Sequence, residues 1–174
     1  MVEYHKIKTI FERDIDGTKK LIEGEYRDKA VEYLKDCEWI FTEKVDGTNI
    51  RVMWDGHKVA FAGRTDRAEI PTRMWDVLNN YFRTDEAEQI FEQIFGEQEA
   101  ILYGEGYGGK IQKGANYKET EDFILFDIEV NGCFYSLEAC QSIAKALDIE
   151  YVPVIHKGKL SDGVEIVKNK QNLK

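Results

Sequence analysis

The segment Glu43-Lys44-Val45-Asp46-Gly47-Thr48-Asn49-Ile50-Arg51 sets a lysine between two predicted strands and directly before a tight turn. Asp46-Gly47 favours that turn, and Asn49 places a polar side chain beside the lysine. A lysine in this setting is a candidate nucleophile whose amine would attack a phosphorus atom. An exposed lysine has a pKa near ~10.4, so this role needs burial or neighbouring cations to lower it. The apolar neighbours that could provide a partly desolvated setting are Ile40, Phe41 and Val45. A surface lysine in a hairpin is the alternative interpretation, since short motifs also match by chance.

Strand and helix patterns alternate on both sides of this segment. Asp55-Gly56 and Asn131-Gly132 are typical of hairpin turns. Because hairpins recur, the sequence predicts an α+β fold with mainly antiparallel sheets and flanking helices. The predicted strands are Trp39–Lys44, Asn49–Trp54, Lys58–Ala62, Ala100–Gly104, Phe123–Val130, Cys133–Tyr135 and Tyr151–Ile155. The predicted helices are Asp28–Leu34, Met74–Phe82, Asp85–Phe95, one capped by Ser136 and one capped by Ser161.

Length and composition limit the class of protein. A chain of 174 residues that is 43% hydrophobic can bury one sizeable core, which predicts a single domain over residues 1–174. No apolar run approaches the roughly 20 residues of a membrane span, and the N-terminus lacks a signal peptide's apolar stretch. The three cysteines are widely spaced and odd in number, which favours a reducing compartment. We therefore expect a cytoplasmic protein without membrane contact.

The charge balance gives weak information about nucleic acids. A net charge of -9 argues against non-specific binding of a phosphate backbone by the whole surface. It does not exclude a local basic groove. Positive residues do cluster in the sequence, at Arg64, Arg67 and Arg73 and again at Lys110, Lys113 and Lys118.

The segment around Lys44 resembles the nucleotidyl-acceptor motif of the covalent nucleotidyltransferases, the superfamily of ATP-dependent ligases and mRNA capping enzymes. It looks most like the RNA ligases, and the resemblance covers about Trp39 to Ile128. The resemblance implies a nucleotidyltransferase fold of the ligase adenylation type. It also implies ATP and Mg²⁺ as cofactors, and RNA with 5′-phosphate and 3′-hydroxyl ends as the partner. In this family the lysine that Lys44 matches forms a phosphoamide with AMP.

Three further motifs, which contain Arg64, Glu105 and Phe126, follow in the order that the family has them. Glu105, at the end of Leu102-Tyr103-Gly104-Glu105, matches a glutamate that binds the ribose hydroxyls, and a carboxylate can accept both hydrogen bonds. Phe126 would stack on adenine, although an aromatic residue in a strand is more often core. The implied nucleotide-binding residues are Glu43, Asn49, Arg64, Glu105, Phe126 and Asp127, with RNA contacts expected at Arg67, Lys110 and Lys113. No metal ligand is identified. The glycine-rich segment of residues 104–109 is expected to link two predicted strands, and the alternative for Glu105 is that it simply begins a loop there. The segment does not form a phosphate loop, because the GxxxxGK[ST] spacing is absent.

Two later motifs of the family are not evident in the sequence. Asp162–Lys168 superficially resembles the fourth, but the apolar spacing of Leu160, Val164 and Val167 predicts a helix instead. Residues 169–174 match the fifth poorly. We therefore expect an incomplete adenylation domain whose partner is a missing C-terminal segment, and which is weak or inactive alone. Two alternatives stay open: a nucleotide- or RNA-binding module without the chemistry, such as one half of a split ligase, and a GTP-using guanylyltransferase of the capping type.

Overall fold

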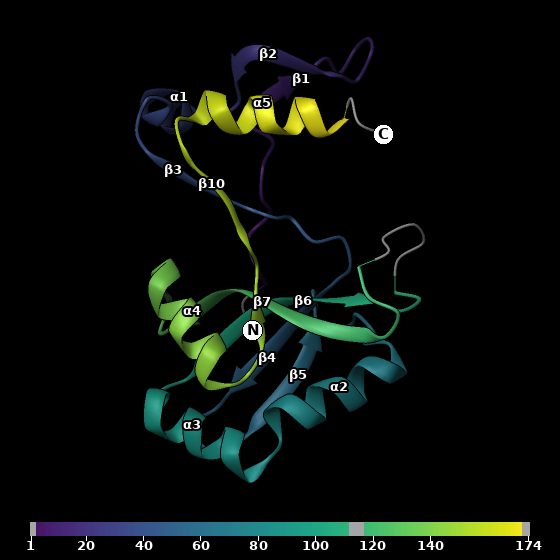
Figure 1. Ribbon diagram of the computed structural model, residues 1–174, viewed down its shortest axis with the longest axis vertical. Coiled ribbons are helices and arrows are strands. Elements are labelled where there is room, and N and C mark those ends of the chain that lie inside the picture. Colours follow the sequence, from purple (N-terminus) through teal and green to yellow (C-terminus); the bar gives the residue numbers. More distant parts are fainter. Residues whose placement is uncertain (1–2, 112–116, 172–174) are drawn as a thin grey trace. The chain divides into compact units, whose positions relative to one another are not determined.

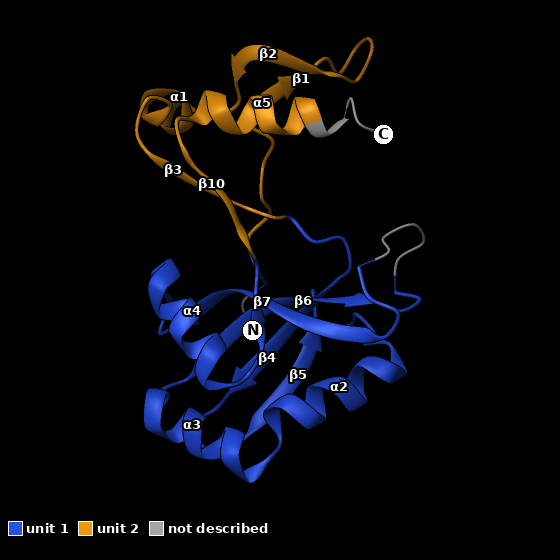
Figure 2. Ribbon diagram, viewed as in Figure 1, with its two compact units in different colours: residues 1–4, 44–152 blue, residues 5–43, 153–174 orange. Residues whose placement is uncertain are grey.

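The computed structural model describes residues 3–111 and 117–171, and the chain forms two compact units (Figure 2). Unit 1 comprises Met1–Tyr4 and Lys44–Val152, and unit 2 comprises His5–Glu43 and Pro153–Lys174. None of the helices in these described ranges combines the length and the apolar character that crossing a membrane requires.

Unit 1 is built on one twisted sheet whose strand order is β5-β4-β6-β7-β8 (Figure 1). All neighbours in this order are antiparallel, and β9 adds to β7 as a parallel neighbour. The predicted α+β class with mainly antiparallel strands is therefore confirmed. The strands are β4 (Thr48–Trp54), β5 (Val59–Gly63), β6 (Ala100–Gly108), β7 (Glu121–Val130), β8 (Cys133–Phe134) and β9 (Glu150–Tyr151).

Both hairpins that the sequence predicts are present. Gly56 joins β4 to β5 with a φ of 95°, in the left-handed region that favours glycine. Asn131 and Gly132 join β7 to β8 with φ values of 51° and 79°, the pair of positive angles that a two-residue hairpin turn needs.

Three helices of unit 1 contribute their apolar faces to one core: α2 (Thr72–Phe82), α3 (Asp85–Phe95) and α4 (Leu137–Ala146). Figure 1 shows α2 and α3 running along one side of the sheet. At the centre, the ring of Phe82 lies 5.3 Å from that of Phe123, edge to face, and 6.3 Å from that of Phe91. Burying each such ring contributes about 1.5–3 kcal/mol. The predicted cap of α4 is confirmed, because Ser136 Oγ accepts the Ala139 N–H.

The described residues of unit 2 form two two-stranded sheets and two helices. β1 and β2 were not expected from the sequence. Leu21 in β2 is 47% exposed, and a strand with so little burial lacks the apolar alternation that reveals strands. The elements are β1 (Phe11–Arg13), β2 (Leu21–Tyr26), α1 (Lys29–Leu34), β3 (Trp39–Thr42), β10 (Val154–Gly158) and α5 (Leu160–Gln171).

Two predicted strands differ in extent from the structure. The predicted strand Tyr151–Ile155 is divided, because Pro153 has no N–H to donate and β9 and β10 pair with different strands on either side of it. The glycine-rich segment expected to link two strands is itself sheet, since β6 continues to Gly108. Glu105 therefore lies within a strand rather than at the start of a loop.

Residues 160–167 form a helix, as their apolar spacing predicts, but Ser161 does not cap it. α5 already begins at Leu160, and the carboxylate of Asp162 accepts the Lys159 N–H at 2.8 Å. Gly163 lies where a Cβ would overlap the ring of Phe41, so the glycine lets α5 approach that ring closely.

Candidate active site

The sheet of unit 1 has one face packed on the helices and an opposite face that carries polar side chains. Successive residues of a strand point to opposite faces. Ile50 and Leu102 are fully buried in the core beneath the helices, so Asn49 and Glu105 lie on the other face. These two residues are directly opposite each other in the β4–β6 pair. Two of the predicted site residues are thus neighbours on one rigid surface.

Arg64 is brought to the same row of the sheet. Ile50 pairs with Gly63 on β5 and with Gly104 on β6. Because both pairs are antiparallel, one step along each strand leads to Arg64, Asn49 and Glu105. The Arg64 side chain is exposed. Asn49 on β4, Glu105 on β6 and Arg64, directly after the end of β5, are therefore neighbours across three adjacent strands.

Glu105 has an unusual electrostatic environment. Its side chain is half-buried, and burial raises the pKa of its carboxyl from 4.5 to about 7. The charge of Lys44 and a backbone hydrogen bond from Gly47 act in the opposite direction, while the charge of Asp46 raises the pKa further. The turn that follows Lys44 therefore lies beside this carboxyl.

Lys44 is less enclosed than the sequence suggested. Its side chain is exposed, and β3 ends before it at Thr42. Ile40, one of the expected desolvating neighbours, is 41% exposed and belongs to unit 2 with Phe41. Of the three expected neighbours only Val45 is buried, so the prediction of a lysine desolvated by its strand neighbours is wrong. Val45 packs instead in a small cluster with Tyr107, Ile124 and Val152, which ties the chain beside Lys44 to the sheet.

Gly47 brings the turn into direct contact with β6. A Cβ at this position would overlap the carbonyl oxygen of Gly106 and lie 2.9 Å from Cγ of Glu105. Glycine is needed here because of this close approach of two backbones. The Asp46-Gly47 pair thus fixes where the turn lies as well as its shape.

Asn49 carries a polar atom without a partner. Its Oδ1 is buried and accepts no hydrogen bond from residues 3–111 or 117–171. Buried side-chain oxygens are nearly always paired in folded proteins, and an unpaired one costs about 1–3 kcal/mol. A donor supplied by a ligand or a water molecule fits this position.

A bulge in β7 presents Phe126 and Asp127. Tyr103 pairs with Asp127 and the next residue, Gly104, pairs with Leu125, so Phe126 is an extra residue in the strand. Phe126 is half-buried and packs against the cluster that contains Val45. The segment between Lys44 and its turn and the ring predicted to stack on adenine are therefore joined by the same apolar contacts.

Tyr4 contacts both of these residues and was not recognised in the sequence. Its hydroxyl donates to Asp127 Oδ2 at 3.0 Å, and its ring lies 5.0 Å from that of Phe126, edge to face. Burial and the Asp127 carboxylate raise the pKa of the Tyr4 hydroxyl. A single tyrosine near the chain start has no periodic pattern around it that could have indicated this role.

Arg51 is a second residue whose role was not recognised. Its side chain is fully buried, an unusual place for a guanidinium. Nε donates to the carbonyl of Gly63 at 2.8 Å, and Nη2 pairs with Asp66 at 2.7 Å. The bond from Arg51 also holds the pKa of the Asp66 carboxyl below its usual range. Arg51 thereby fixes the end of β5, directly before Arg64.

A family model described as RNA ligase matches residues 37–173 of the chain. The chain belongs to the RNA ligase family.

Solved structures of an RNA ligase from Naegleria gruberi share the fold. The structure with PPi matches with a TM-score of 0.62 and 22% identity, and covers 76% of this chain and 40% of its own. The structure of a variant with ATP and Mn matches with a TM-score of 0.62 and 21% identity, and it also covers 76% of this chain and 40% of its own. The structure of a variant with AMP and Mn matches with a TM-score of 0.61 and 20% identity, and it covers the same 76% of this chain and 40% of its own. The chain thus spans about 40% of the length of these RNA ligases.

The family resemblance also indicated Glu43, Arg67, Lys110 and Lys113. Glu43 belongs to unit 2, where its N–H donates to the Pro153 carbonyl at 3.1 Å. Arg67 and Lys110 are exposed in unit 1. Lys113 lies outside the described residues. These predicted contacts stay predictions.

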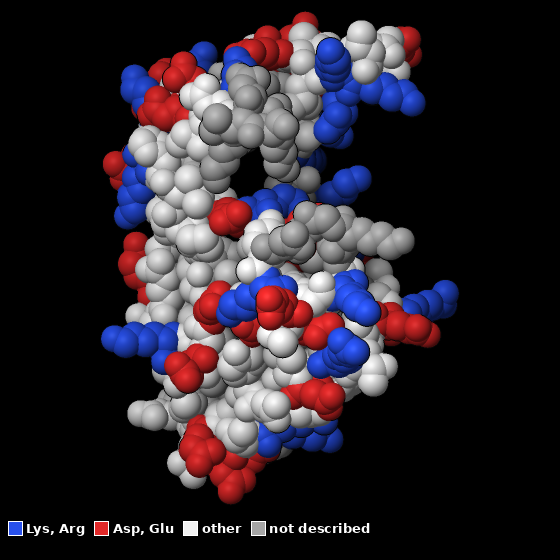
Figure 3. Space-filling model, turned by 45° about the vertical axis from the view of Figure 1, so that its right-hand side comes forward, with Lys and Arg blue, Asp and Glu red and all other residues white. Residues whose placement is uncertain are grey.

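The described part of this RNA ligase chain offers no cluster of protein side chains for a metal ion. No three His, Cys, Asp or Glu side chains in residues 3–111 and 117–171 gather in a way that could hold a metal ion. Acidic and basic side chains are interspersed on the face shown in Figure 3, in keeping with the net charge of -9. These residues alone do not fit a resident Mg²⁺, so the catalytic steps below are assigned without one.

Proposed function

We propose that this chain carries the nucleotidyl-transfer site of an ATP-dependent RNA ligase. The Lys44 amine loses a proton and attacks the α-phosphorus of ATP. A P–N bond forms, the bond between the α-phosphorus and the bridging oxygen breaks, and pyrophosphate leaves with that electron pair. The amine's second proton passes to solvent, leaving AMP on Lys44. AMP then passes to the 5′-phosphate of RNA, and a 3′-hydroxyl displaces it to join the ends.

The observation that carries this proposal is the arrangement around Glu105. Lys44 acts electrostatically on its half-buried carboxyl, and Asn49, with its unpaired Oδ1, is directly opposite. A nucleophile, a carboxyl and an amide therefore meet on one face of one unit. β4 and β6 hold Asn49 and Glu105 more firmly than loops would, which lowers the entropic cost of aligning a reaction.

Each residue has a proposed role in holding ATP. Glu105 accepts hydrogen bonds from the ribose hydroxyls, and Phe126 stacks on the base. Asn49 and Arg64 face the phosphates. Hydroxyl donors favour the ionised carboxylate, so bound nucleotide lowers the pKa of Glu105 from about 7. ATP then binds more weakly as the pH falls below 7.

Incubation with α-labelled ATP and MgCl₂ tests the proposal. We expect a covalent label on the wild-type protein and none on Lys44→Ala, whereas Lys145→Ala, an exposed lysine on α4, labels normally. A label that persists in Lys44→Ala would remove the assignment. Competition by unlabelled GTP that equals competition by ATP would favour a guanylyltransferase instead.

A binding module without the chemistry is the second candidate. The exposure of Lys44 and the lack of a metal-binding cluster in residues 3–111 and 117–171 favour it. It predicts that ATP raises the melting temperature while no covalent product forms. The same incubation, followed by thermal unfolding, therefore separates the two functions.

A further inference from the structure

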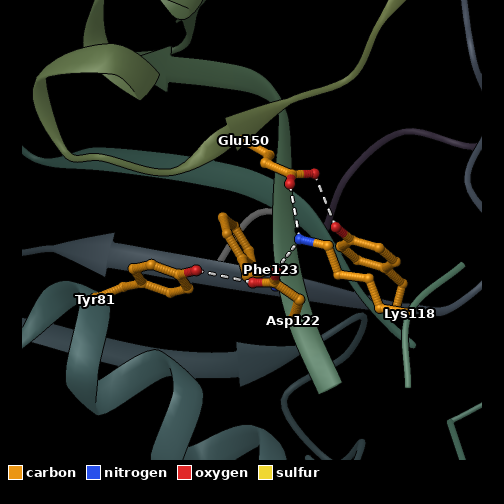
Figure 4. Close-up of polar contacts among 6 residues, drawn as sticks. Tyr81, Lys118, Asp122, Phe123 and Glu150 are labelled. Atoms are coloured by element: carbon orange, nitrogen blue, oxygen red, sulfur yellow. Dashed lines mark hydrogen bonds and ion pairs between the residues drawn. The ribbon is translucent and has the colours of Figure 1, made fainter. Parts of the chain in front are cut away.

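The Lys118 ammonium group contacts two carboxylates and one aromatic ring (Figure 4). Its Nζ pairs with Asp122 at 2.5 Å and with Glu150 at 2.7 Å, and it lies 5.7 Å from the centre of the Tyr107 ring. The Tyr107 hydroxyl donates to the other oxygen of Glu150 at 2.8 Å. The carboxylates raise the pKa of Lys118, so its charge is firmly retained.

These contacts connect elements that are far apart in the sequence. Asp122 is the second residue of β7 and also accepts from the Tyr81 hydroxyl of α2 at 3.0 Å. Glu150 belongs to β9 and Tyr107 to β6. Exposed ion pairs contribute little singly, but Asp122 is only 13% exposed and one cation serves two carboxylates here. Removing Lys118 would leave two like charges facing each other.

The neighbouring residue, Tyr117, connects these contacts to the turn that follows Lys44. The ring of Tyr117 lies 5.8 Å from that of Tyr107, edge to face. Its hydroxyl accepts the backbone N–H of Asp46 at 3.4 Å, two residues after Lys44. The carbonyl of Lys118 accepts the Gly109 N–H at 3.0 Å, which ties the same segment to the end of β6.

We propose that Lys118 is a positioning residue for the Lys44 nucleophile. By bridging Asp122 and Glu150, it holds Tyr117 against the turn after Lys44 and so fixes the distance of that amine from the nucleotide. This inference rests on the proposed function.

Rates of covalent labelling with α-labelled ATP test this assignment. We expect Lys118→Met to label about tenfold more slowly at saturating ATP. The half-saturating ATP concentration should stay within about twofold of wild type, because a misplaced Lys44 amine slows the labelling step more than it weakens ATP binding. Tyr117→Phe should slow labelling similarly, and the double variant should be no slower than Lys118→Met. Lys118→Arg should recover most of the rate. Lys145→Met, which removes an exposed lysine on α4, is the control.

Hydrogen exchange at the Asp46 amide tests the structural link independently of activity. Lys118→Met should exchange at least about fivefold faster there, with amides of β4 unchanged. An unchanged Asp46 amide, or a labelling rate equal to wild type, would overturn the inference. If the wild-type protein forms no label, the proposed function has failed, and the exchange result alone decides whether Lys118 positions the turn.

Discussion

Asn49 and Glu105 are directly opposite each other on β4 and β6, and both side chains lie on the sheet face away from the helices. One has a buried oxygen without a partner in the described residues, and the other has a carboxyl whose pKa is raised to about 7. Both are costs to the folded protein. Costs of this kind on a rigid sheet are typical of sites organised for a ligand.

Asn49→Ala should weaken ATP binding without weakening the fold. We expect the dissociation constant for ATP to rise about tenfold, because the hydrogen bond that the Asn49 amide N–H would donate to a charged phosphate is lost. The free energy of unfolding should stay within about 1 kcal/mol of wild type, since the substitution removes an unpaired buried oxygen. Calorimetric titration and urea unfolding measure the two quantities. Asn80→Ala, at an exposed position of α2, should change neither.

Glu105 should make the folded protein less stable as pH rises. Between pH 4.5 and 7 the folded chain keeps a proton that the unfolded chain has released, so the free energy of unfolding falls through this window. We expect the contribution to be about 1–2 kcal/mol after solvent screening of a half-buried group. Urea unfolding at pH 5 and pH 8 should show this loss in wild type and a smaller one in Glu105→Gln. Equal losses in both proteins would contradict the assignment.

The neighbouring charges should move the pKa of Glu105 in opposite directions. Lys44→Ala removes the cation that lowers this pKa, so the carboxyl should titrate at a higher pH than in wild type. Asp46→Asn removes an anion that raises the pKa, so it should titrate at a lower pH. NMR titration of the Glu105 side-chain carboxyl measures both. Shifts of the same sign in the two variants would show that Lys44 is not beside this group.

Gly47→Ala should displace the turn that follows Lys44. The added methyl would overlap the Gly106 carbonyl, so we expect a loss of about 1–3 kcal/mol in the free energy of unfolding and a large fall in labelling. Gly24→Ala is the control. It adds strain at a φ of 91° in unit 2 without a neighbour within 4 Å, so it should cost about 1–2 kcal/mol while labelling continues. Normal labelling of Gly47→Ala would argue against this steric account.

Local patterns predicted most of unit 1, because its signals are strong. The stripe that includes Ala87, Phe91 and Phe95 placed a helix at Asp85–Phe95, where α3 lies. The site was less accessible to sequence reasoning. Glu105 looked like the start of a loop because of its glycine neighbours, yet Gly104 and Gly106 are glycines that allow close packing inside β6.

Contacts between distant segments were beyond the reach of local patterns. Tyr4 contacts Phe126 and Asp127 across more than a hundred residues of sequence. The bulge that adds Phe126 to β7 depends on the register between two strands, which the alternation within one strand does not specify. The exposure of Lys44 likewise follows from where β3 ends, and strand ends are the least certain part of a sequence prediction.

Locating the bound nucleotide by peptide mass spectrometry tests the central claim most directly. After incubation with ATP and MgCl₂, AMP should be found on Lys44 alone, through a bond that is lost in acid and survives in alkali, as a P–N bond does. AMP on a different side chain, or a labelled Lys44→Ala protein, would contradict it.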